Sequence, residues 1–138
     1  MKNYLIVSQY KHAQNRVLKL IDDFNSFADC SVGVVKVDAN QKDELVFAKR
    51  NGVNYTNLKN IDLNLFSHYL KNHVTANKNV IVFFVIMDSS KLKDNEIDYF
   101  KKNLSSFNKE NIFLIICSEK KSKLSFINNS FAVIDDVG

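Results

Sequence analysis

Polar residues directly follow several apolar segments of the chain, and they are the best candidates for binding chemistry. Residues 34–37, 80–87 and 112–117 are apolar apart from Lys36, and each segment ends in polar side chains. The candidate ligand-binding residues are Asp38, Asp88, Ser89, Ser118, Lys120 and Lys121. If these segments are parallel strands, their carboxyl ends meet at one edge of a sheet, where open α/β proteins bind ligands. Polar residues also end any buried strand, so the pattern alone names neither a reaction nor a ligand.

The motifs that define common enzyme and cofactor classes are missing. The turns at residues 8–12, 38–42 and 89–93 contain no glycine, although phosphate-binding loops need glycine where a strand turns into a helix. The three histidines, His12, His68 and His73, form no metal-ligand spacing with each other or with a cysteine or carboxylate. We therefore predict no catalytic residue, no metal site and no cofactor, and the sequence favours a protein that is not an enzyme.

The spacing of Asp88 and Ser118 resembles that of response-regulator receiver domains. In those domains an acidic phosphoacceptor ends the third strand and a hydroxyl residue ends the fourth. Receivers also carry an acidic pair after the first strand, where this chain has Ser8 and Gln9, and a lysine after the last strand, where it has Asp135 and Asp136. Without carboxylates to hold magnesium, phosphoryl transfer lacks its main electrostatic support. The resemblance therefore implies at most a degenerate, non-phosphorylated relative.

The apolar segments themselves predict the fold class. Residues 80–87 form an unbroken apolar run, which is typical of a strand buried on both faces of a parallel sheet. Residues 4–7, 32–37 and 112–117 are predicted as further strands, and residues 131–134 as a fifth strand at an edge. We expect one α/β domain over residues 1–138, with a three-layer, mostly parallel sheet of four to five strands, as in flavodoxin, receiver or Rossmann-like topologies.

Helical periodicity fills the connections between these strands. Apolar residues recur at three- and four-residue spacing in residues 12–28, 61–73 and 94–107, and more briefly in 41–50. Asp94 is the predicted N-cap of the fourth helix. Residues 53–60 are polar and rich in asparagine, which predicts a loop with at most a short extended piece at 53–55.

Composition limits the functional classes that remain. Hydrophobic residues make up 46% and charged residues 25% of the 138 residues, as in ordinary globular domains. The longest apolar run is far shorter than the roughly 20 residues that span a bilayer, and no signal peptide is recognised, so a cytoplasmic location is expected. Cys30 and Cys117 are too few for a disulfide framework and are expected to be reduced thiols.

Three functional hypotheses follow. The first is a non-enzymatic interaction or assembly module that binds another protein, with aromatic residues such as Tyr10, Tyr55 and Tyr69 as anchors. The second is a degenerate receiver-like domain that responds to a small ligand or phosphoryl group at the strand ends. The third is nucleic-acid binding through lysines in the last third of the chain, which interleaved carboxylates disfavour. A homo-oligomer is left open.

Overall fold

The computed structural model describes residues 3–27, 31–39, 53–76, 80–107, 111–120, 124–127 and 129–135. In chain order its strands and longer helices are β1 (Asn3–Val7), α1 (Tyr10–Phe27), β2 (Ser31–Val37), β3 (Val53–Leu58), α3 (Leu63–Ala76), β4 (Val80–Ile86), α4 (Asp94–Asn103), β5 (Ile112–Ser118) and β6 (Phe131–Asp135). Two short 3-10 helices, η1 (Ser89–Lys91) and η2 (Leu104–Ser106), precede and follow α4. The helix expected over residues 41–50, Cys30 and Lys121 lie outside the described residues.

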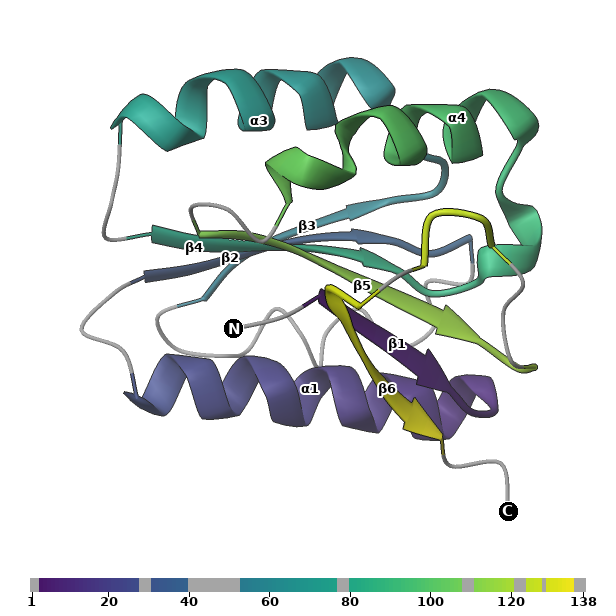
Figure 1. Ribbon diagram of the computed structural model, residues 1–138. Helices are drawn as coiled ribbons and strands as arrows, with labels where there is room; N and C mark the ends of the chain where they lie inside the picture. Colours follow the sequence, from purple (N-terminus) through teal and green to yellow (C-terminus); the bar gives the residue numbers. More distant parts are fainter. Residues whose placement is uncertain are drawn as a thin grey trace.

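All six strands pair in parallel in one sheet, in the order β3-β2-β4-β5-β1-β6. Helix α1 covers one face, and helices α3 and α4 cover the other (Figure 1). The predicted three-layer α/β fold with a mostly parallel sheet is therefore confirmed. Strand β4, the unbroken apolar run, lies between β2 and β5, where both of its faces are covered.

The predicted strand number was too low by one. Residues 53–58, expected to be a loop, form the edge strand β3, which pairs with β2 from Val32↔Val53 to Val37↔Leu58. An edge strand with a solvated side needs few apolar residues, because hydrogen bonds to one neighbour and a half-buried face hold it in place. Asn54 and Thr56 are exposed, while Tyr55 and Asn57 are partly buried. Exposed and partly buried residues therefore alternate as in other strands, although most of these residues are polar.

The N-cap prediction for the fourth helix was also wrong by one residue. Lys93 is the N-cap of α4, and Asp94 is the first helical residue. The Glu96 carboxylate accepts the backbone N–H of Lys93 at 2.8 Å, so Glu96 satisfies the donor at the helix start.

Two apolar clusters lie on the two faces of the sheet. On the α3 and α4 face, Phe66 stacks on Phe84 with ring centroids 4.2 Å apart and an interplanar angle of 12°, and Phe100 joins them. On the α1 face, Val17 and Ile21 of the helix are buried with Phe83 and Ile115 of the sheet. Because packed layers cover both faces, the strands are held in fixed positions relative to one another. The side chains that follow the strand ends are therefore held in place as well.

Candidate ligand pocket at the carboxyl edge of the sheet

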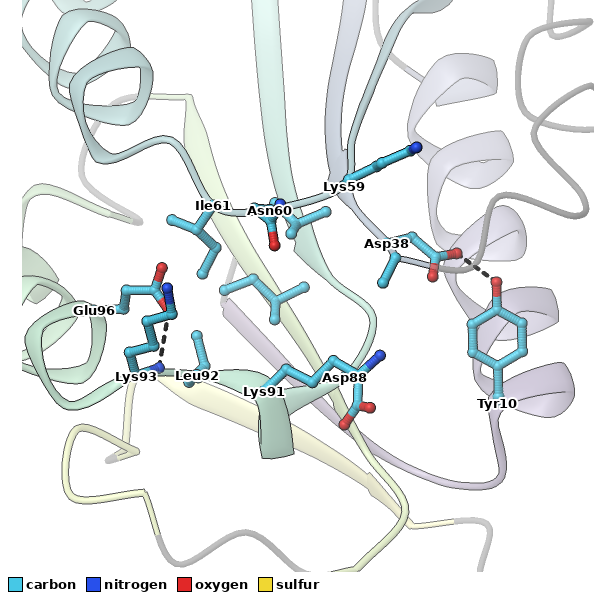
Figure 2. A pocket seen from close by; sticks show the side chains of 13 residues that line it. Tyr10, Asp38, Lys59, Asn60, Ile61, Asp88, Lys91, Leu92, Lys93 and Glu96 are labelled. Carbon is cyan, nitrogen blue, oxygen red and sulfur yellow. Dashed lines mark hydrogen bonds between the residues drawn. The ribbon is translucent and has the colours of Figure 1, made fainter.

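A pocket of about 330 Å³ opens at the carboxyl ends of β2, β3 and β4 (Figure 2). Strands β2 and β4 are neighbours in the sheet. The chain goes from β2 to β3, towards one edge of the sheet, and from β4 to β5, towards the opposite edge. Adjacent strands whose connections depart in opposite directions leave a crevice at their carboxyl ends, which is where ligands of open α/β sheets bind. The pocket therefore lies at the topological switch point of this sheet, and its volume is at the lower end of the range for small-molecule sites.

The pocket combines an apolar surface with a charged rim. Val37 and Ile86 contribute from the ends of β2 and β4, while Ile61 and Leu92 contribute from the segments after β3 and η1. The polar and charged residues that line it are Tyr10, Asp38, Lys59, Asn60, Asp88, Lys91, Lys93 and Glu96. An apolar surface with a few polar groups around it is the usual composition of a site for a small organic molecule.

Asp38 is held by one group from α1 and by one group from β2, the strand that it follows. The hydroxyl of Tyr10, at the start of α1, donates a hydrogen bond to Asp38 Oδ2, as Figure 2 shows. The Lys36 ammonium lies 3.4 Å from the same oxygen. Both side chains of this ion pair are buried, with 0% of Lys36 and 4% of Asp38 exposed. A buried ion pair of this kind needs close geometry and further hydrogen bonds to offset desolvation, and Tyr10 supplies one of them.

The other two carboxylates of the rim also accept protein hydrogen bonds. Asp88 Oδ1 accepts the backbone N–H of Ser90 at 3.0 Å and its hydroxyl at 2.6 Å, which makes Asp88 the N-cap of η1. The Glu96 carboxylate accepts the Lys93 backbone N–H. All three carboxylates therefore have part of their negative charge directed to donors within the protein.

The three lysines of the rim differ from the carboxylates in this respect. Among the residues that the structure describes, no carboxylate lies within ion-pair distance of the Lys59, Lys91 or Lys93 ammonium groups. Lys59 follows β3, Lys91 is the last residue of η1, and Lys93 is the N-cap of α4. The rim therefore presents cationic groups from two different segments beside an apolar surface, and none of them forms an ion pair within the described part of the chain.

A polar cluster continues behind Asp38 on the α1 face of the sheet. The Lys36 ammonium lies 5.9 Å from the centroid of the Tyr55 ring, and the Tyr55 hydroxyl donates to Asn57 Oδ1 at 3.0 Å. Cys117 is buried on the same face, and burial raises the pKa of its thiol to about 12; the charge of Asp38 contributes to the rise and that of Lys36 opposes it. This thiol is therefore no nucleophile at neutral pH.

The predicted site residues are only partly brought together. Asp38 and Asp88 both line the pocket. Ser89 lies within η1, outside the lining. Lys120 is exposed, and its carbonyl accepts the Ser118 hydroxyl at 2.6 Å; neither residue lines the pocket.

The strand order separates the residues that the receiver comparison placed together. Ser8 and Asp88 follow β1 and β4, and β5 lies between these strands. In the 2-1-3-4-5 order of receiver domains, the first strand directly adjoins the strand that carries the phosphoacceptor. The pocket here instead uses residues after β2 and β3, which the spacing of Asp88 and Ser118 did not point to.

No protein-family model and no curated protein matches the chain significantly. Within the described part of the chain, no three His, Cys, Asp or Glu side chains form a group suited to a metal ion. No helix in that part is long and apolar enough to cross a membrane.

Proposed function

We propose that this protein binds a small organic anion in the pocket at the carboxyl ends of β2, β3 and β4. The observation that carries the proposal is the pairing of an apolar surface with three rim lysines that have no ion-pair partner among the described residues. Burial of the apolar part of a ligand would supply most of the affinity, and charge-assisted hydrogen bonds to the ammonium groups would select for negative charge.

The exposed surface gives less support to the protein-binding hypothesis. Val133, with 51% of its surface accessible, is the single exposed large hydrophobic residue in the described part of the chain. Of the proposed aromatic anchors, Tyr10 and Tyr55 donate hydrogen bonds to Asp38 and Asn57, and Tyr69 packs edge-on against Phe84. These half-buried tyrosines make contacts within the fold, which weakens their case as anchors for a partner. A protein partner and a cytoplasmic location remain expectations from the sequence alone.

The experiment that tests the proposal is a titration of the ¹⁵N-labelled protein with 1-naphthalenesulfonate, followed by two-dimensional NMR. This probe pairs a compact apolar body with one negative charge. Amide shifts are expected to concentrate at Asp38, Ile61 and Leu92, with little change in β6.

Two variants sharpen the measurement. Lys59→Ala, Lys91→Ala, Lys93→Ala removes the rim cations and is expected to weaken binding up to about a hundredfold, since each lost charge-assisted hydrogen bond costs on the order of 1 kcal/mol. Lys101→Ala, Lys102→Ala removes two exposed cations near the end of α4, outside the pocket, and is the matched control. Shifts confined to another surface, or no saturable shifts, would overturn the proposal.

A further inference from the structure

We infer that the ligand's anionic group is a phosphate, so that the pocket takes a small phosphate monoester with a compact apolar or aromatic body. This inference rests on the proposed function, because it specifies the anion that the same pocket binds. It follows from the kind of cation at the rim, from where the cations stand, and from the size of the cavity.

The cations of the rim are of one chemical kind. Among the described residues that line the pocket, three are lysines and none is an arginine. The planar guanidinium fork of arginine matches two oxygens of a carboxylate or of a phosphate, whereas an ammonium group is a point charge with three donors that can point in different directions. A tetrahedral group with three terminal oxygens and nearly two negative charges fits several separate point charges better than a flat carboxylate does.

The rim lysines come from two segments of the chain. Lys91 and Lys93 are held on one short segment, because Asp88 caps η1 and Glu96 caps the start of α4. Lys59 lines the pocket from the segment after β3, and Figure 2 shows its side chain extending away from Lys91 and Lys93. Because the Lys59 side chain is exposed, it can turn towards a bound anion. Ammonium groups from two segments then bind different oxygens of the same anion, which distributes its charge over several donors.

The size and lining of the cavity limit the rest of the ligand. A volume of about 330 Å³ is small, and the apolar part of the lining consists mainly of Val37, Ile61, Ile86 and Leu92. Branched aliphatic side chains form a surface against which one flat ring or a short hydrocarbon group can pack. The phosphate would then remain at the rim, where its charge keeps contact with water and with the lysines.

The carboxylates of the rim repel a bound anion, and removing this repulsion provides a sharp test. Glu96 accepts the Lys93 N–H and carries a negative charge beside two of the lysines. Glu96→Gln keeps a side-chain oxygen for the helix cap and removes the charge. For a phosphate ligand the affinity is expected to rise severalfold in this variant, in the opposite direction to the lysine variants.

The experiment compares four probes of similar size by calorimetry at one pH and ionic strength: phenyl phosphate, benzenesulfonate, benzoate and phenol. Phenyl phosphate is expected to bind about tenfold more tightly than benzoate, benzenesulfonate to lie between them, and phenol to bind weakly or not at all. The preference for phenyl phosphate is expected to decrease in Lys91→Ala, Lys93→Ala and to persist in the control Lys101→Ala, Lys102→Ala.

Each outcome has a distinct meaning. If the three anions bind with equal affinity at the pocket, the inference of a phosphate is wrong and the proposed function stands. If none of the anions binds and 1-naphthalenesulfonate does not bind either, both fail. If Glu96→Gln weakens the binding of phenyl phosphate, the anion does not lie at this rim and the inference is overturned.

Discussion

The Lys36 ammonium and the Asp38 carboxylate, two residues apart at the end of β2, form an ion pair of 3.4 Å that is almost completely buried. Alternate residues of a strand point to the same face, so the i, i+2 spacing itself brings the two side chains together. The pair sets the charge balance beside the pocket, because Asp38 lines the pocket while Lys36 lies behind it.

We expect Lys36→Met to destabilise the protein by about 3 kcal/mol, because it leaves the buried Asp38 carboxylate without its cationic partner. The double variant Lys36→Met, Asp38→Asn is expected to lose much less than the sum of its two single variants. Urea denaturation of the four proteins measures this coupling. Additive free energies would show that the pair contributes no coupling.

Tyr10→Phe removes the hydroxyl that donates to Asp38 while keeping the ring at the start of α1. A lost hydrogen bond to a charged group costs about 1.5–3 kcal/mol, so the free energy of unfolding should fall by roughly that amount. Tyr4→Phe is the control, because no hydrogen bond of the Tyr4 hydroxyl is found among the described residues. Equal effects of both substitutions on urea denaturation would contradict the assignment.

The Cys117 thiol should be nearly inert in the folded protein. In a Cys30→Ser background it is the only thiol, and its pKa of about 12, against an ordinary value of 9.0, lowers the thiolate fraction at pH 8 by about a thousandfold. Reaction with a disulfide reagent such as DTNB should therefore be at least that much slower in the folded protein than in urea. Rapid labelling without denaturant would show that the β5 strand end opens.

The same pKa has a consequence for stability at high pH. The folded state holds the proton more tightly than the unfolded state, so this contribution is complete below pH 9 and is lost as pH rises towards 12. Cys117→Ala should therefore show a smaller loss of stability between pH 9 and pH 11 than the parent. Other groups titrate in this range, and the difference between the two proteins isolates the thiol.

Gly33→Ala should be tolerated in the middle of β2. A β-carbon there would lie 3.5 Å from Val82 Cγ2, which is ordinary van der Waals contact, and no positive φ requires glycine. The substitution removes conformational freedom from the unfolded chain, so we expect the free energy of unfolding to rise by about 0.4–1 kcal/mol. A decrease would indicate crowding on the α3 and α4 face of the sheet.

The sequence predicted the central strands and the edge strand β6, but it missed the edge strand β3. The run at residues 80–87 identified β4, because a strand covered on both faces must be apolar throughout. Strand β3 was missed because Asn54 and Asn57 can be accommodated in a strand that, among the described strands, pairs with β2 alone. Lys36 interrupts an apolar segment, and a charge at such a position usually indicates a solvated face; here its partner Asp38 permits burial.

The pocket was foreseen only in part, for a related reason. Asp38 and Asp88 were placed at the carboxyl edge because that position depends only on where each strand ends. The position of Lys59 at the pocket depends on the existence of β3. The positions of Lys93 and Glu96 depend on where α4 begins. That β2 and β4 adjoin is a property of the whole sheet, which local sequence patterns do not encode.

Strand β1 lies between β5 and β6, the last two strands of the sheet. The side-chain oxygen of Asn3 accepts the Leu114 N–H across a sequence separation of 111 residues, and Tyr4 pairs with both Ile115 and Ala132. During synthesis strand β1 therefore remains unpaired in this sheet until residues 112–118 have left the ribosome, while β2, β3 and β4 already have one another as neighbours. The distant pairing also predicts slow folding. Strand β1 precedes the other described strands in the chain and is thus expected to be among the last to enter the sheet.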